Sequence, residues 1–209
     1  MTFPLLTGFA AGLACAVGFS VWTVSTDVRA PQDPQDPKVS QEMQKMMETA
    51  RRYTQPGPHH AHLKRFLGKW KTETRIFMGG NASPAEPGAA EFDWLMDGRW
   101  VKGSGTGTMM GMPAQTFVVI GYDNFKMSYV VTTVSSMDTA MLRSEGDLTQ
   151  DGKTLLTYGT LDEYLTGEHD KMVKYVWRFV GPDEFVLEVH DLPIGETGTK
   201  VVEVRYRRA

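Results

Sequence analysis

The chain has 209 residues, a formal net charge of −3 and 41% hydrophobic residues. This length can bury the core of one domain of ordinary size, with room for short additional segments. No run of basic residues is long enough to neutralise successive phosphates, so we expect no binding to nucleic acid. The 21 glycines and 11% aromatic residues are typical of a β protein with many turns.

Residues 1–30 form a hydrophobic segment that we interpret as a signal peptide or a membrane anchor. No charged residue precedes Asp27, and an apolar stretch of about 20 residues is long enough to span a bilayer. A small-x-small cleavage signal stands at residues 28–30, but no basic residue precedes the apolar run, as a secretory signal normally requires. Cleavage therefore stays open. In either case we expect an extracytoplasmic protein that is secreted, periplasmic or membrane-anchored.

Residues 31–39 and 40–58 differ in composition. The first stretch contains PQDPQDP, which is too rich in proline and aspartate for a helix or a core, so it predicts a spacer. The second places methionines at helical spacing before a Pro-Gly-Pro sequence, which predicts an amphipathic helix followed by a turn. A methionine face of this kind is typical of a packing surface; the membrane surface or a soluble partner is the alternative.

From residue 59 to residue 209 the chain is typical of one β domain. Strand-like runs alternate with turn signals such as Asp151-Gly152 at intervals of roughly ten residues. The predicted strands are residues 70–78, 89–96, 99–109, 114–122, 127–134, 139–149, 153–161, 171–180, 184–191 and 199–207. No long helical pattern interrupts them, so we expect consecutive antiparallel strands and no parallel units.

Each predicted strand has one apolar and one polar face. Phe92, Trp94 and Met96 alternate with acidic residues, for example. A sheet of about ten strands with one apolar face can close on itself, which removes its exposed edges. The sequence therefore predicts an all-β fold: an antiparallel up-and-down barrel with room for side chains and one small ligand.

Several motifs occur in a fixed order along the chain. They are PGPHHAHLKRFLGKW at residues 56–70, EFDWLMDGRWV at 91–101, GMP at 111–113, GYDN at 121–124, SEG at 144–146 and VVEVRYRR at 201–208. With these motifs, roughly residues 41–208 resemble the bacterial family called domain of unknown function 1579. The resemblance implies a calycin-like barrel, related in shape to lipocalins, fatty-acid-binding proteins and nitrobindins. It implies no settled activity, because a fold alone does not specify one.

The resemblance also implies a structural role for the Gly-x-Trp sequence Gly68-Lys69-Trp70. In calycins the indole of this motif packs at the closed end of the barrel, and an arginine of the last strand lies across it. Trp70 takes that position here, and Arg205 or Arg207 is the expected partner, a cation stacked on an aromatic face. We interpret these residues as a base plug and not as a ligand site.

Polar and aromatic side chains that share the predicted inner face are candidates for a cavity lining. They are Thr72, Thr74, Trp94, Thr106, Tyr129, Thr133, Tyr175 and Trp177. Such a lining suits a mostly apolar small molecule with a few polar groups. The alternative is that the same residues fill the barrel as ordinary core.

The histidines are the best candidates for metal or cofactor chemistry. His59, His60 and His62 stand close together before the barrel. Two interpretations are open: the three histidines hold a metal, or His60 acts as a cap or as part of a site. His190 is the one histidine on a predicted barrel strand, but its parity places it with Glu188 on the solvent face, which disfavours an axial haem ligand. We therefore expect no cofactor and no metal, with haem and a metal ion as the alternatives.

Three classes of function remain open. The first is an extracytoplasmic binding protein for a small hydrophobic molecule, attached to the membrane if residues 1–30 are uncleaved. The second is a structural or interaction module with a filled barrel. The third is an enzyme acting on a lipid-like or small aromatic substrate, but the sequence offers no catalytic residues for it, because no two titratable groups share a predicted pocket.

Overall fold

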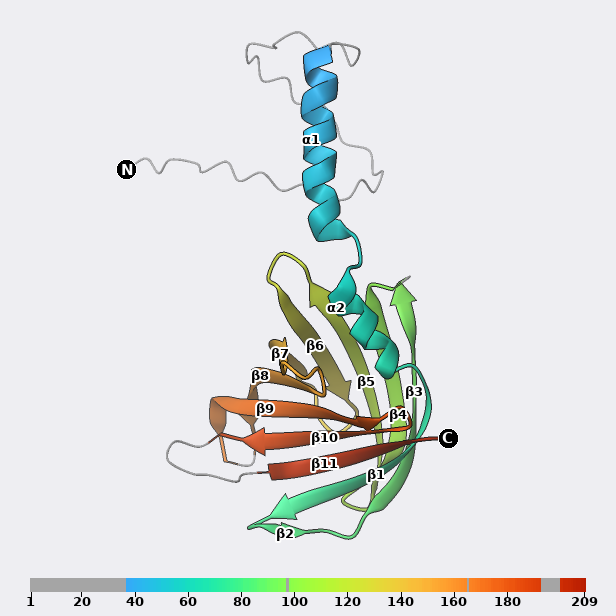
Figure 1. Cartoon of the computed structure of the whole chain (residues 1–209). Helices are drawn as coiled ribbons and strands as arrows, with labels where there is room; N and C mark the ends of the chain where they lie inside the picture. Colours follow the sequence, from blue (N-terminus) through green and yellow to red (C-terminus); the bar gives the residue numbers. More distant parts are fainter. Residues whose placement is uncertain (1–36, 97, 165, 193–199) are drawn as a thin grey trace, which may run out of the picture. The chain divides into compact units, whose positions relative to one another are not determined.

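The computed structural model describes residues 37–96, 98–164, 166–192 and 200–209. The chain separates into two units, Met1–Gln44 and Lys45–Ala209, and the second holds the β domain (Figure 1). The targeting segment expected at residues 1–30 lies outside the described residues, as does most of the expected spacer. In the part of the chain that the structure describes, no helix has the length and apolar character needed to cross a membrane.

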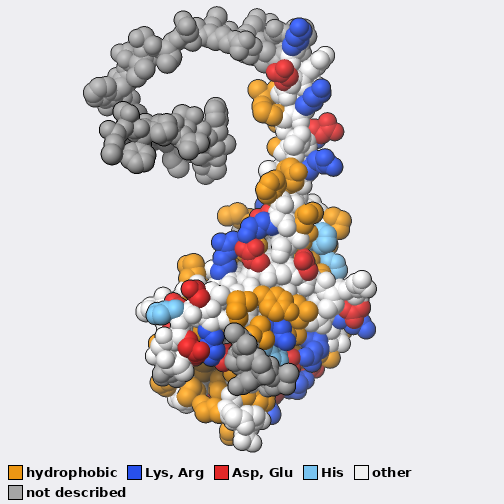
Figure 2. Space-filling model, turned by 90° about the vertical axis from the view of Figure 1, so that its left-hand side faces the viewer, with side chains coloured by type: hydrophobic (Ala, Val, Ile, Leu, Met, Phe, Trp, Pro, Cys, Tyr) orange, Lys and Arg blue, Asp and Glu red, His pale blue; other side chains and the backbone are white. Residues whose placement is uncertain are grey.

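Among the described residues, three helical elements precede the barrel: α1 (Pro37–Thr54) and the short α2 (Pro58–Ala61) and 3₁₀ turn η1 (His62–Arg65). Helix α1 begins three residues before the predicted start, since proline is tolerated in the first turn, where its missing N–H has no helical partner. Its methionines Met43, Met46 and Met47 are at least half exposed, so the predicted packing face is not buried among the described residues. Hydrophobic, acidic and basic side chains lie together on its surface (Figure 2).

All ten predicted barrel strands are confirmed, and they pair in chain order. They are β1 (Gly68–Met78), β3 (Glu86–Met96), β4 (Trp100–Met109), β5 (Met112–Asp123), β6 (Ser128–Ser135), β7 (Met141–Leu148), β8 (Thr154–Glu163), β9 (Glu168–Gly181), β10 (Glu184–Asp191) and β11 (Lys200–Arg208). All pairings are antiparallel, and β11 also pairs with β1, which closes the barrel. The sequence did not predict β2 (Asn81–Ala82), which extends the end of β1 as a short hairpin.

One end of the barrel is filled by aromatic side chains. Phe66, Trp70, Phe92 and Phe185 are each at most 2% exposed, and Phe66 and Trp70 contact Phe185 edge to face at centroid distances of 5.4 and 4.8 Å. Full burial of one such ring contributes about 1.5–3 kcal/mol to stability. This cluster, which we call the aromatic core, closes one end of the barrel.

The segment of residues 53–67 covers this end. It is hydrogen-bonded directly to three of the β-hairpins there and to the fourth through Arg208 of β11. The connection β3–β4 contributes Arg99, which donates to Thr54 O at 3.3 Å, and β5–β6 contributes Asn124, which donates to Gln55 O at 2.8 Å. In β7–β8, Gly152 O accepts from Arg65, and in β9–β10, Pro182 O accepts from Arg208, which also donates to Leu67 O. We call residues 53–67 the capping segment.

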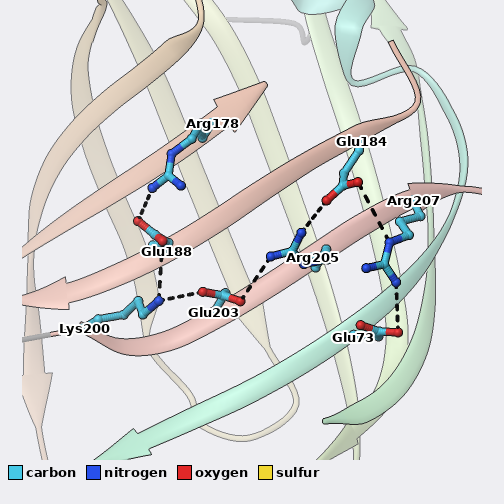
Figure 3. A network of polar contacts seen from close by, with 8 residues as sticks. All are labelled: Glu73, Arg178, Glu184, Glu188, Lys200, Glu203, Arg205 and Arg207. Carbon is cyan, nitrogen blue, oxygen red and sulfur yellow. Dashed lines mark hydrogen bonds and ion pairs between the residues drawn. The ribbon is translucent and has the colours of Figure 1, made fainter. Parts of the chain in front are cut away.

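A row of alternating charges crosses the outer surface of β9, β10, β11 and β1 (Figure 3). It runs Arg178, Glu188, Lys200, Glu203, Arg205, Glu184, Arg207 and Glu73, with N–O separations between 2.5 and 4.0 Å. Burial acts to raise the pKa of Glu203, yet hydrogen bonding to Lys200 and the neighbouring cations hold that pKa below its usual value. A single exposed ion pair adds little stability. This row, however, includes the pair Arg207–Glu73, which joins β11 to β1 where the barrel closes.

Candidate functional site

A cavity of about 470 Å³ lies inside the barrel, beyond the aromatic core, and residues from all ten barrel strands line it. Its apolar lining includes Ile76, Phe77, Met109, Val118, Val131, Leu142, Leu161, Leu187, Val189, Val202 and Val204. Hydroxyl groups stand between these side chains. The cavity is therefore mostly apolar, with polar groups at separate points.

Small residues on β3, β4 and β5 explain why this part of the barrel is hollow. Ala90, Gly105, Gly107 and Ala114 line the cavity on neighbouring strands. A Cβ at Gly105 would stand 2.6 Å from Thr116 Oγ1, so a larger residue fits there only if the Thr116 side chain moves. Gly105 and Gly107 thus add no side chain to the inner face, whereas Phe92 and Val118 fill the position beside Gly103. These glycines do not form a phosphate-binding loop.

Six of the eight predicted lining residues border the cavity: Thr72, Thr74, Thr106, Thr133, Tyr175 and Trp177. Thr106, however, is exposed and pairs with the exposed Ala89 and Gln115, while Gly105 and Gly107 take the inner positions of β4, so its predicted inward orientation was wrong. Trp94 and Tyr129 are not among the lining residues, so their assignment was wrong. Trp94 packs against the buried hydrophobic cluster that includes the aromatic core, and the Tyr129 hydroxyl donates to His59 O at 2.9 Å under the capping segment. Alternation along a strand indicates which face of the sheet a side chain takes, but not how far along the barrel axis it lies.

Trp177 and Tyr206 form the floor of the cavity, since both line it and both contact the aromatic core. The Trp177 ring meets Phe66 edge to face at 5.5 Å, and the Tyr206 ring stacks on Phe185 at 4.2 Å. Trp177 is 3% exposed, and no described residue accepts a hydrogen bond from its enclosed Nε1. Burial alone raises the pKa of the Tyr206 phenol. The floor is therefore aromatic and uncharged.

The other end of the cavity carries acidic side chains. Asp138, Glu163 and Asp191 line it there, each at or beyond the end of a strand that lies away from the aromatic core. Lys171 pairs with Asp191 at 2.7 Å, and this hydrogen bond raises the pKa of Lys171. Burial raises the pKa of Tyr175 to about 12, and Asp138 and Asp191 add to the shift. We call this end the acidic mouth.

The base plug exists, but its arginine differs from the prediction. The guanidinium of Arg208 lies over the Trp70 ring, with Cζ 3.9 Å from the ring centroid. Arg205 instead pairs with Glu184, and Arg207 pairs with Glu73, both on the outer face. Trp70 and Arg208 are partners in the β1–β11 register, and opposed residues point to the same side of a sheet. The sequence therefore assigned the inner face of β11 to the wrong residues, one position away from the correct ones. For the same reason it did not predict Tyr206 as a lining residue.

His60 is a buried cap within the capping segment. Its Nδ1 accepts a hydrogen bond from Gly57 N–H at 3.0 Å, and burial holds its pKa below the usual value. The neighbouring His59 ring stacks on Tyr122 at 4.3 Å. Within the described residues, no group of three or more His, Cys, Asp or Glu side chains is arranged to hold a metal.

His190 is half-buried beside Glu188, with His190 Nε2 3.5 Å from a Glu188 oxygen, and it is not among the residues that line the cavity. Its parity agrees with the sequence pattern, since Leu187, Val189 and Asp191 take the inner positions of β10. The histidine of this strand therefore points away from the place where a ligand fits.

Comparison with known proteins gives a family but no activity. A family model described as "Protein of unknown function (DUF1579)" matches residues 55–208, a range that contains all ten barrel strands. Among solved structures, the chain is similar to a redesigned β-barrel at 11% identity, over 70% of this chain and 93% of the other, with a TM-score of 0.36. That likeness is too weak to support an argument. No curated protein matches the chain.

Proposed function

Because this chain belongs to the DUF1579 family, whose description assigns no function, we propose its role from its own geometry: it binds one small, mostly apolar molecule inside the barrel. The observation that carries the proposal is the cavity of about 470 Å³. Sites for small molecules commonly measure about 300–1,000 Å³ and combine an apolar lining with a few placed polar groups. The barrel matches both features.

The cavity also weighs against a barrel that serves only as a filled structural module. A filled barrel needs large inner side chains at every level, whereas β3, β4 and β5 present Ala90, Gly105, Gly107 and Ala114. Interiors without a ligand are normally packed to near crystal density, because each void loses dispersion contacts. A hollow of this size costs stability, which a bound molecule offsets.

The hydrophobic segment of residues 1–30 adds a location to the proposal. It directs the barrel out of the cytoplasm and keeps it at the membrane where it is not cleaved. A binding protein for apolar molecules gains from this position, since membranes concentrate such compounds. Protease protection of the full chain in intact cells tests the location separately from binding.

Binding is tested with the full chain and N-phenylnaphthylamine, a neutral apolar fluorophore that brightens in dry cavities. We expect one probe per chain, counted by fluorescence titration and native mass spectrometry. Thr133→Trp fills the cavity from β6 and abolishes this binding. Thr132→Trp is the matched control, because its side chain lies on the opposite face of the same strand. Absence of saturable binding to the unmodified chain, or equal binding by both variants, contradicts the proposal.

A further inference from the structure

The polar groups in the floor and mouth of the cavity define the chemistry of the ligand more closely than the cavity volume does. The floor residue Tyr206 is stacked on the aromatic core, and its hydroxyl makes no hydrogen bond within the described residues. The same holds for the hydroxyls of Thr72, Thr74 and Thr133. A hydroxyl can donate one hydrogen bond and accept others, so these groups can pair with a polar atom of a ligand.

The floor contains no charge to neutralise an ion. Burial raises the pKa of Tyr206, and no described charged side chain contributes to that shift. Arg143 borders the cavity, but its guanidinium is mostly exposed and pairs with Glu145 at 2.8 Å. An ionised group buried without a counter-charge is strongly disfavoured. A carboxylate at the floor would therefore be destabilised.

The acidic mouth opposes anions as well. Asp138, Glu163 and Asp191 supply three carboxylates to the lining. Among the described cations nearby, Lys171 pairs with Asp191, and Lys200, which lies over the Phe77 ring, pairs with Glu188 and Glu203 on the outer face. A negative potential at the entrance of a cleft lowers the local concentration of anions and slows their association. This effect weakens as salt concentration rises, because these groups are near solvent.

From these observations we infer that the barrel takes an uncharged ligand whose hydrogen-bond acceptor, such as a carbonyl oxygen, meets the Tyr206 hydroxyl at the floor, and that it discriminates against carboxylates such as ionised fatty acids. The inference rests on the proposed function, because it specifies the molecule that occupies the same cavity. The apolar body of the ligand then lies along the wall of β3, β4 and β5, and its outer end faces the acidic mouth.

Three fluorescent probes with one ring system test this inference on the full chain. Prodan carries a neutral propionyl ketone; its carboxylate analogue carries an anion in the same place; the parent dimethylaminonaphthalene carries neither. We expect prodan to bind at least tenfold more tightly than the carboxylate analogue at low salt. We expect Tyr206→Phe to weaken prodan about twofold to tenfold, the range for one hydrogen bond, and to leave the parent compound unchanged.

Two control variants separate this contact from general damage. Tyr129→Phe also removes one hydroxyl, but that hydroxyl lies under the capping segment, so prodan affinity should stay unchanged. Asp138→Asn should improve binding of the carboxylate analogue at low salt by a larger factor than it changes that of prodan. The side chain of Asp138 keeps an oxygen to accept from Ala140 N–H after this change.

The outcomes distinguish the two proposals. If prodan and the parent compound bind but Tyr206→Phe leaves the prodan affinity unchanged, the Tyr206 contact is wrong while the binding function stands. If the carboxylate analogue binds more tightly than prodan, the selection for uncharged ligands is wrong. If neither these probes nor N-phenylnaphthylamine bind, the proposed function fails and this inference fails with it.

Discussion

Arg208 lies over the indole of Trp70, with its Cζ 3.9 Å from the ring centroid, so a side chain of the last barrel strand stacks on a side chain of the first. The same guanidinium donates to Leu67 O at 2.5 Å and to Pro182 O at 3.0 Å. The indole in turn donates from Nε1 to Phe66 O at 2.7 Å. One arginine thus joins β11, the capping segment and a hairpin at the closed end.

Arg208→Met should lower the free energy of unfolding by about 2–3 kcal/mol, since it removes a cation–π contact and two hydrogen bonds from a charged donor. Arg207→Met is the matched control on the same strand, where the outward side chain forms exposed ion pairs worth about 0–1 kcal/mol. Urea unfolding followed by circular dichroism measures both. Equal losses would show that the stacked arginine contributes no more than a surface charge.

Gly68→Ala should destabilise the barrel by at least about 2 kcal/mol, because Gly68 has a φ of +111°, which L side chains rarely adopt. A Cβ at this position would also collide with the Arg208 guanidinium and displace it from the Trp70 ring. At Gly181, which has an ordinary φ and open space where a methyl group would stand, alanine should change stability by less than about 0.5 kcal/mol. A neutral Gly68→Ala variant would overturn this explanation of the Gly-x-Trp motif.

Two tryptophan variants compare an indole N–H that donates a hydrogen bond with one that has no acceptor among the described residues. Trp70→Phe and Trp177→Phe remove the same atoms from buried positions, but only Trp70 donates a hydrogen bond within the described residues, to Phe66 O. Trp70→Phe should therefore cost about 1–3 kcal/mol more than Trp177→Phe, because it leaves a buried carbonyl unpaired. Thermal unfolding of the two variants at one pH makes the comparison. The reverse order would mean that Trp177 Nε1 has a partner in solution.

His60 should make the fold sensitive to mild acid. Its folded-state pKa is lowered from 6.5 by burial first, while the hydrogen bond to the Tyr122 backbone acts in the opposite direction. The unfolded chain then binds a proton more readily, so this contribution to stability is present above about pH 6.5 and is lost as the pH falls through the folded-state pKa.

His60→Gln keeps an acceptor for Gly57 N–H but cannot take up this proton. Its unfolding free energy should therefore fall less than that of the unmodified chain between about pH 8 and pH 5. An identical pH dependence in the His60 variant would contradict the assignment.

The sequence predicted the strands well because each strand carries its own evidence. Alternation in runs such as residues 89–96 and turn signals such as Asp151-Gly152 act locally, and the barrel follows from ten such runs in succession. The helix before the barrel was predicted on the same basis. Its start was misplaced because proline near an N-terminus is compatible with both a spacer and a first helical turn.

The candidate site was harder to predict, because it depends on relations between strands. Trp94 and Tyr129 share the inner face with Thr133, but the register and the aromatic core place them below the cavity. In β11, nearly every residue of the closing sequence is large or charged, so its phase is ambiguous until its pairing with β1 is known. The cavity itself depends on small residues of three different strands, which become neighbours only when the strands pair, so no single strand of the sequence indicates it.

The β1–β11 closure has a consequence for how the chain folds. It brings together residues such as Glu73 and Arg207, which are 134 positions apart in the sequence. During synthesis, β1 can pair with β3 early, but its other edge has no partner until β11 has left the ribosome. Contacts of such long range slow folding, and an unpaired edge invites association with other chains. The barrel therefore completes its fold late, after nearly the whole domain has been translated, and depends on protection of that edge until then.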